Sequence, residues 1–307
     1  MIEGLNIYKK DEYIDNFVQD AAELRLLGKG DGTEIMLQKI KKNETFFINP
    51  CDSSDTMEFF YILNGEIDSF DNKYTKLVNG DYFFTHDLKS IVQFKTLTEV
   101  TLLYISTKPL FHFLSTIIKE LTKLAREVEK KDMYTHSHIK RVEEYAIKIA
   151  NKLNLPEESI ENIAFASLFH DIGKIDTPDE ILKKPSALTK EEYDIIKKHP
   201  IRGAEIVEKT YYKKVCKIIS QHHEKLDGSG YPFALKGEEI MIEARIIAVA
   251  DAFDAMITDR PYRKGLSYKE AISELKKYSG IHFDANIVIV FINILLNEKI
   301  ITESDTM

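Results

Sequence analysis

The chain has 307 residues, 44% of them hydrophobic and 30% charged, which suits a folded protein with room for two domains. Residues 1–110 carry 12 Lys and Arg against 18 Asp and Glu, and the remainder carries 30 against 32, so the formal net charge is −8. Neither half forms the basic surface that a nucleic-acid polymer needs, whereas a small phosphorylated ligand remains compatible.

Two further features bear on location. The longest apolar run, residues 287–296, is about half the length of a membrane span, so it predicts a buried helix and no membrane span. Residues 1–15 lack the basic segment and apolar core of a signal peptide. With its two cysteines interpreted as free thiols, the chain is expected in the cytoplasm.

Residues 1–108 are rich in short β-type segments. The predicted strands lie in residues 32–40, 45–50, 58–67, 80–86 and 99–106. Turn signals such as Asn64-Gly65 and Asn79-Gly80 separate them, which predicts a small all-β barrel or sandwich.

One part of this region resembles the strand–turn–strand pattern of cupin-type barrels, namely EFFYILNG (58–65) followed by NGDYFF (79–84). Cupin enzymes carry a His-x-His pair upstream of the Glu, and none exists here. Glu58 is therefore predicted to be an ordinary strand residue. The region is interpreted as a sensory or regulatory barrel without catalysis of its own.

Residues 109–131 are predicted to form a linking helix. Leu114, Ile117, Leu121, Leu124 and Val128 recur at intervals of three and four. The stripe allows two interpretations: a helix packed on the following domain, or a signalling helix that pairs two protomers. The second predicts a homodimer through the helix of residues 110–131.

Residues 132–307 form the third predicted domain, which is all-α and gives the whole chain an α+β multidomain organisation. Helices are expected at residues 137–153, 158–170, 189–197, 200–209, 212–223, 241–258, 267–278 and 284–298. Thr189 with Glu192, and Ser267 with Glu270, have the spacing of capping boxes. The lysine pairs, such as 197–198, are interpreted as solvated helix faces.

The sequence HDIGK (170–174) ends the apolar run IAFASLF, and Gly173 in it is expected to permit a tight turn. An adjacent His-Asp pair is weak evidence alone, since a His can cap a helix end and a buried Asp can accept backbone hydrogen bonds. Other candidate ligands nearby strengthen the evidence for a metal site, because five of the nine histidines fall between residues 138 and 223. The candidate ligands are His138, His170, Asp171, His199, His222, His223 and Asp251.

Five imidazoles and two carboxylates suit Fe or Mn first, and Ni or Zn as alternatives, better than Ca or Mg. The absence of a thiolate from the set argues against a structural zinc site. Seven ligands are too many for one ion with an open position. They suffice for two ions if Asp171 bridges, and such a pair can hold a hydroxide and clamp a phosphate diester.

Five motifs together resemble the HD-GYP family of cyclic di-GMP phosphodiesterases, within the wider HD metal-dependent phosphohydrolase superfamily. They are HDIGK, KKHPIRGAEI (197–206), HHEKLDGSGYP (222–232), ARIIAVADAFDAMITDRPYR (244–263) and GIHFDANIV (280–288). The resemblance covers about residues 132–296. An HD pair alone would identify only the superfamily. The block ending in Gly-Tyr-Pro narrows the resemblance to the HD-GYP family.

The resemblance implies roles for these residues. The seven candidates above are the metal ligands, with Asp171 bridging, and Asp171 and Lys174 are the catalytic residues. The implied substrate contacts are Lys174 on a phosphate oxygen, Gly230, Tyr231 and Pro232 in the pocket loop, and Arg260 and Arg263 on the phosphate or guanine. Asp254, three residues after Asp251, is expected behind the ligands, orienting one of them or Arg260.

Some family members bind a third metal with a Glu four residues before the first ligand His. This chain has Tyr134 there, so two metals are expected. His136 is interpreted as a solvated residue at a helix start.

The sequence thus predicts hydrolysis of cyclic di-GMP to pGpG, GMP or both by a bridging hydroxide at a two-metal site. Two alternatives remain open: a receptor that binds cyclic di-GMP without hydrolysing it, and an HD-superfamily phosphohydrolase for another cyclic dinucleotide such as cyclic GMP-AMP.

Overall fold

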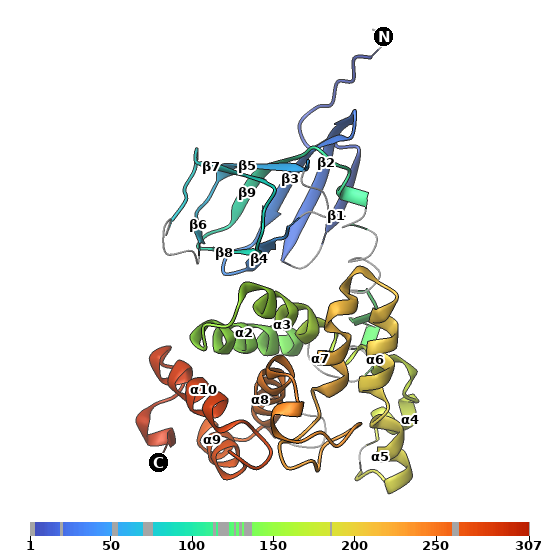
Figure 1. Ribbon diagram of the computed structural model, residues 1–307, viewed down its shortest axis with the longest axis vertical. Coiled ribbons are helices and arrows are strands. Elements are labelled where there is room, and N and C mark those ends of the chain that lie inside the picture. Colours follow the sequence, from blue (N-terminus) through green and yellow to red (C-terminus); the bar gives the residue numbers. More distant parts are fainter. Residues whose placement is uncertain are drawn as a thin grey trace. The chain divides into compact units, whose positions relative to one another are not determined.

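The chain divides into two compact units, Met1–Lys119 and Glu120–Met307 (Figure 1). The computed structural model describes residues 4–18, 21–50, 55–69, 76–112, 115, 123–125, 127–128, 131, 137–184, 186–259 and 264–306. In these residues no helix combines the length and the apolar character that crossing a membrane requires.

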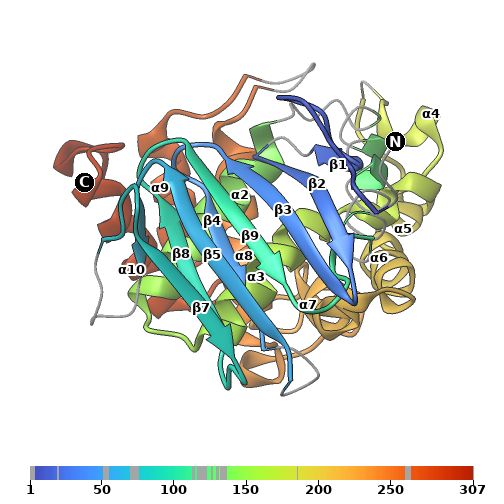
Figure 2. The same cartoon turned by 90° about the horizontal axis from the view of Figure 1, so that it is seen from above.

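The first unit is built from β-strands. They are β1 (Asp15–Val18), β2 (Ala22–Gly30), β3 (Thr33–Ile40), β4 (Thr45–Ile48), β5 (Met57–Asn64), β6 (Ile67–Ser69), β7 (Tyr82–His86), β8 (Val92–Thr96) and β9 (Val100–Ser106). An antiparallel sheet has the order β1-β2-β3-β9-β5-β7, seen face-on in Figure 2, and a second sheet has the order β4-β8-β6. The prediction of an all-β region is confirmed.

The prediction of a barrel needs correction. Among the described residues no ladder joins the six-stranded sheet to the three-stranded one, so β1 and β7 stay edge strands. A closed barrel would require hydrogen bonds across those edges. The described strands form two separate sheets instead.

Aromatic side chains fill the space between the two sheets. Phe60 of β5 stacks on Tyr104 of β9 and on Phe83 of β7, with ring centroids 4.4 and 4.8 Å apart. Phe83 in turn stacks on Phe94 of β8, which stacks on Phe46 of β4. The stack runs from one sheet to the other because alternate residues of each strand point inward.

Glu58 belongs to the inward-facing set of β5 and is 5% exposed. The hydroxyl of Tyr104 donates a hydrogen bond to its carboxylate, and Thr85 on β7 lies 3.5 Å from the same group. Its partners are thus side chains of the neighbouring strands.

A second buried carboxylate holds the chain where it leaves the sheets. Glu34 on β3 is 5% exposed, and its Oε2 accepts hydrogen bonds from the backbone N–H groups of Leu110 and Phe111, at 2.7 and 2.8 Å. These N–H groups start the helical turn after β9, where no earlier carbonyl is available to them. The side chain of Phe111 is itself buried in the core of this unit.

Removing this carboxylate is expected to destabilise the first unit. Glu34→Ala leaves two N–H groups beside the core without an acceptor, and we expect a loss of about 1–3 kcal/mol in the free energy of unfolding. Urea unfolding of the full chain measures it, with the exposed Glu99→Ala as a matched control. A loss no larger than that of the control would contradict the assignment.

The second unit is helical. Its described elements are α2 (Ser137–Lys152), α3 (Glu157–Phe169), η1 (Ile172–Asp176), α4 (Asp179–Leu182), α5 (Lys190–Ile196), α6 (His199–Glu208), η2 (Tyr211–Val215), α7 (Cys216–Gln221), η3 (Gly237–Glu239), α8 (Ile242–Ile257), α9 (Tyr268–Lys277), α10 (Ala285–Asn297) and η4 (Glu303–Thr306). The predicted all-α character of this region is confirmed.

Local sequence explains several helix starts. Thr189 and Glu192 form a capping box at α5, and Ser267 and Glu270 form another at α9, as predicted. The helix expected at residues 212–223 differs, because its first turn is the 3₁₀ segment η2 and the α-helix begins at Cys216.

A cluster of rings fixes the helix that carries two acidic residues of the site. Phe253 of α8 is fully buried, and its ring meets those of Tyr145 on α2 and Phe291 on α10 edge to face, with centroids 5.7 and 5.0 Å apart. Since Phe253 lies between Asp251 and Asp254, this packing sets where α8 presents both carboxylates.

The domain boundaries at residues 108 and 131, and the pairing of helices 110–131, stay predictions. Leu114, Ile117 and Leu121 lie outside the described residues. Of the predicted stripe the structure describes Leu124 and Val128, the latter buried.

Candidate metal centre

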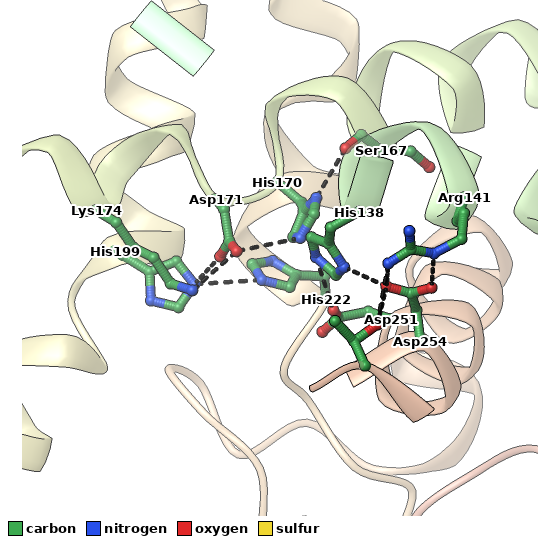
Figure 3. A network of polar contacts seen from close by, with 11 residues as sticks. His138, Arg141, Ser167, His170, Asp171, Lys174, His199, His222, Asp251 and Asp254 are labelled. Carbon is green, nitrogen blue, oxygen red and sulfur yellow. Dashed lines mark hydrogen bonds and ion pairs between the residues drawn. The ribbon is translucent and has the colours of Figure 1, made fainter. Parts of the chain in front are cut away.

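Seven side chains predicted as ligands come together from five places in the chain. Figure 3 labels all of them except His223. His138 lies in α2, His170 follows α3, Asp171 precedes η1, His199 begins α6, His222 and His223 follow α7, and Asp251 lies in α8. Most stand at helix ends, where a side chain can point along the axis toward a common point.

Their donor atoms form two groups. Asp171, His199, His222 and His223 offer atoms that all lie within 4.8 Å of one another, and so do His138, His170 and Asp251. Each group has the mixed nitrogen and oxygen donors that divalent transition metals prefer. The described residues therefore contain a His/Asp cluster capable of binding metal.

Asp171 links the two groups. Its Oδ1 lies 3.2 Å from Nε2 of His199, and its Oδ2 lies 3.3 Å from Nε2 of His170. One carboxylate oxygen thus faces each group, which is the placement that a bridging ligand needs.

Three of the histidines are oriented by the same backbone contact. Nδ1 of His170, His199 and His222 lies 2.7, 2.8 and 2.6 Å from the carbonyl oxygen three residues earlier. A carbonyl oxygen can only accept, so Nδ1 carries the hydrogen and donates it. In the neutral ring Nε2 then presents a lone pair to the cluster.

This arrangement fits a bound cation. Nε2 of His199 and Nε2 of His222 face each other at 3.3 Å, and two nitrogen lone pairs at this distance repel unless a proton or metal ion lies near both. The residues present therefore suit metal ions in two ways: they are numerous enough, and the tautomers of the histidines direct Nε2 lone pairs into the cluster.

The electrostatics of the cluster agree with this. Burial raises the pKa of Asp171, but the charges of Lys174 and His170 outweigh it and hold that pKa well below its usual range. Burial and the charges of neighbouring histidines hold the pKa values of His222 and His223 well below the usual 6.5. At neutral pH these three side chains are an anion and two neutral imidazoles, which are the forms that ligate metals.

His170 has the opposite shift. Burial lowers its pKa, but the charge and hydrogen bond of Asp171, the charge of Asp251 and the carbonyl of Ser167 together outweigh burial and raise the pKa to about 9. The ring carries a proton in the absence of metal, and metal binding would release that proton.

Lys174 lies beside the linking carboxylate. Its Nζ is 2.8 Å from Oδ2 of Asp171, and the residue is 8% exposed. One buried cation next to the two groups is suited to an anionic ligand, so its contact with a phosphate oxygen stays a prediction that the placement allows.

Asp254 is fully buried behind His138 and orients it. Its Oδ2 accepts a hydrogen bond from Nδ1 of His138 at 2.7 Å, so Nε2 points toward Asp251 Oδ1, 3.5 Å away. Arg141 pairs with the same carboxylate through Nε and Nη2. Sequence reasoning named Asp254 as an orienting residue, but it missed Arg141, which lies one helical turn after His138 and so on the same face of α2.

Removing the charge of Asp254 is expected to weaken metal binding by the group of His138, His170 and Asp251, called the His138 group. Asp254→Asn keeps the shape but loses the charged partner of His138 and Arg141, and we expect metal affinity at that group to fall about 10- to 100-fold. Metal titration of the chelated protein measures it, with the exposed Asp259→Asn as control. Equal affinity in both variants would contradict the assignment.

Gly173 has a different role from the one predicted. The turn does not need a positive φ here; instead η1 packs backbone to backbone on α6. A Cβ at this position would overlap the carbonyl oxygen of His199 and lie 2.5 Å from the backbone nitrogen of Gly203. The glycine therefore lets the Asp171 segment approach the His199 helix.

The predicted pocket loop folds beside the first group. The ring of Tyr231 lies 4.9 Å from that of His223. A Cβ on Gly230 would lie 2.5 Å from Cα of Glu224, so the loop needs glycine there. Glu224, which sequence reasoning missed, is 4% exposed and accepts hydrogen bonds from the backbone N–H groups of Phe233 and Leu235, which fixes the loop after Pro232.

Four residues named in the sequence analysis, Arg260, Arg263, Tyr134 and His136, lie outside the described residues. The roles of the first two, and the expectation of two metals drawn from Tyr134, stay predictions.

Known proteins resemble part of the chain. A cyclic di-GMP phosphodiesterase of Thermotoga maritima is 40% identical over 194 residues, 62% of this chain and 51% of that protein. The cyclic di-GMP phosphodiesterase response regulator RpfG of Xanthomonas campestris pv. campestris is 40% identical over 171 residues, 55% of this chain and 45% of its own. The 3'3'-cGAMP-specific phosphodiesterase 2 of Vibrio cholerae is 40% identical over 174 residues, which are 55% of this chain and 33% of that protein.

The chain thus spans about half, or less, of the length of the curated relatives it matches. A family model described as HD domain matches residues 120–287, which contain all seven ligand candidates. This confirms the relationship that the HDIGK motif indicated. The chain belongs to the HD domain family.

Proposed function

We propose that the chain is a metal-dependent phosphodiesterase that hydrolyses cyclic di-GMP to pGpG, with GMP as the product of a second cut. The observation that carries the proposal is the pair of donor groups sharing Asp171. Two divalent ions, Fe or Mn before Ni or Zn, would be held by Asp171, His199, His222 and His223 on one side and by His138, His170, Asp251 and Asp171 on the other. When bound, such a pair supplies a hydroxide nucleophile at neutral pH and neutralises charge on the phosphate.

The chain's own residues have separate tasks in this proposal. Asp171 fixes the spacing of the two groups through its two oxygens. Lys174, buried and already paired to Asp171, places a positive charge where a phosphate oxygen gains negative charge. Asp254 and Arg141 hold His138 in one orientation, and Tyr231 closes the pocket beside His223.

Cyclic di-GMP is the proposed substrate because several of the relatives are named for it, at 39–40% identity. A second candidate is 3'3'-cGAMP, since similarly related proteins of Vibrio cholerae are named for that dinucleotide. Both are cyclic dinucleotides with phosphodiester links.

We further propose a regulatory role for the first unit. It is a cupin-like sensory module of residues 1–108, its signal passes along the linking helix of residues 109–131, and two chains pair through that helix. The buried contacts of Glu34 with the start of the helical turn at Leu110 and Phe111 support a firm connection at the exit from the sheets.

Metal removal separates the enzyme from a receptor. Chelated protein, and the same protein reloaded anaerobically with Fe(II) or Mn(II), would be given cyclic di-GMP and 3'3'-cGAMP separately and in competition. We expect turnover only after reloading, with cyclic di-GMP preferred. Tight binding of either dinucleotide without turnover in any metal form would favour the receptor, and preference for 3'3'-cGAMP would reassign the substrate.

A further inference from the structure

A cation sits between two tyrosine rings at the edge of the metal centre. Nζ of Lys197 lies 4.6 Å from the ring centroid of Tyr193 and 5.9 Å from that of Tyr231. The two rings are 6.3 Å apart and nearly perpendicular, with an interplanar angle of 77°. The three side chains come from α5, the turn before α6 and the pocket loop, so tertiary packing brings them together.

This cluster adjoins the donor group around Asp171. The ring of Tyr231 lies 4.9 Å from His223 and 6.5 Å from His199. A ligand whose phosphate reached these histidines would extend over Tyr231 toward Lys197. The distances place the cluster within the reach of a nucleotide.

The groups present are accessible to a ligand. Tyr193 is 44% exposed, and the side chain of Lys197 is 36% exposed. The ion-pair partner of Lys197 is Asp194, 3.4 Å away with its side chain 53% exposed. Such a solvated pair is worth little, so it does not hold the ammonium group against a competing acceptor.

An aromatic ring beside an ammonium group suits a purine base. Bases stack on tyrosine rings whatever their identity, whereas a lysine distinguishes among them by hydrogen bonding. Guanine presents two adjacent acceptors, O6 and N7, and adenine places an amino donor where guanine has O6. A lysine therefore favours guanine at this position.

We infer that Tyr193, Lys197 and Tyr231 form a base-binding subsite that takes a guanine of the substrate, with Tyr193 stacking on the base and Lys197 donating to O6 and N7. The inference rests on the proposed function and adds a base preference to it. Lys197 is a specificity residue in this account, and the chemistry at phosphorus remains with the metal centre.

The test compares Lys197→Met with Lys198→Met, which removes an equal charge from the neighbouring, exposed position. Each metal-loaded protein is assayed on cyclic di-GMP, cyclic di-AMP and bis(p-nitrophenyl) phosphate, a diester without a base. Affinity for a hydrolysis-resistant phosphorothioate analogue of cyclic di-GMP is measured in parallel by calorimetry.

For Lys197→Met we expect the KM for cyclic di-GMP and the Kd of the analogue to rise about 10- to 100-fold, with kcat nearly unchanged. The preference for cyclic di-GMP over cyclic di-AMP should shrink by the same factor. The rate on bis(p-nitrophenyl) phosphate should change less than twofold, and Lys197→Arg should restore part of the affinity. Lys198→Met should match the wild type.

Equal analogue binding by Lys197→Met and wild type would overturn the subsite, and so would an equal loss on cyclic di-GMP and bis(p-nitrophenyl) phosphate, which would indicate a structural role. If the wild type bound the analogue but hydrolysed no dinucleotide, the proposed enzyme would fail and the binding comparison would still decide the subsite.

Discussion

Asp171→Asn is expected to abolish turnover and to lower the metal content of the protein. An amide has the shape of the carboxylate, but only one of its two outer atoms can accept a metal. One oxygen of Asp171 faces each donor group, 3.2 and 3.3 Å from the histidines there. Either orientation of the substituted amide therefore leaves one group without its shared oxygen.

The variant loses a negative charge as well, which costs attraction for both cations. We expect the rate on cyclic di-GMP to fall by at least about a thousandfold. Losses of this size are typical when a group that stabilises the transition state directly is removed.

The matched control is Asp176→Asn, at the end of the 3₁₀ segment η1 that Asp171 precedes; Asp176 is exposed and pairs with Arg202 on the surface. Metal content by mass spectrometry and turnover by chromatography are compared for both variants. We expect wild-type values for the control. Full metal content together with full activity in Asp171→Asn would remove the basis for a shared carboxylate.

Gly173→Ala is expected to damage both the fold and the site. The added methyl group meets backbone atoms of His199 and Gly203 rather than a flexible side chain. The segment that carries Asp171 and the helix that starts at His199 must therefore separate. We expect a loss of about 1–3 kcal/mol or more in the free energy of unfolding, with weaker metal binding at the group these two residues share.

Denaturant unfolding and metal titration test this prediction. The control is Gly30→Ala at the end of β2, where an added Cβ meets no atom within 4 Å. Because Gly173 packs on α6 rather than on α2 or α8, the His138 group should lose less affinity than the Asp171 group. A Gly173→Ala protein as stable as the control, with unchanged metal affinity, would contradict the close-packing account.

Much of the helical unit could be predicted because its signals are local. The capping boxes at Thr189 and Ser267 and the apolar periodicity place helix ends to within a few residues. The ligand candidates could be named because histidines and carboxylates concentrate in one part of the chain. Adjacency in the sequence even suggested that Asp171 links the two groups.

The rest depends on contacts between distant residues. The strands β1, β2 and β8 lie outside the predicted ones. For β2 and β8 a local signal did exist, because Leu24 and Leu26 alternate with Glu23 and Arg25, and Val92 and Phe94 alternate with Gln93 and Lys95. Whether the sheets close into a barrel is decided by edge pairing, which no local pattern encodes.

The same holds around the metal centre. The contact of Arg141 with Asp254 joins residues 113 positions apart, and the reason for Gly173 is the backbone of another helix. The cluster of Tyr193, Lys197 and Tyr231 likewise arises only when α5 and the pocket loop meet. Sequence patterns name the reactive residues well, but they do not name the neighbours that orient them.

The most direct test of the central claim is product analysis of cyclic di-GMP incubated anaerobically with the Fe(II)- or Mn(II)-loaded full chain. The account predicts pGpG, followed by GMP, in the wild type and neither product in Asp171→Asn or in chelated protein. Unchanged cyclic di-GMP in the metal-loaded wild type, or equal product formation after chelation, would contradict a metal-dependent phosphodiesterase.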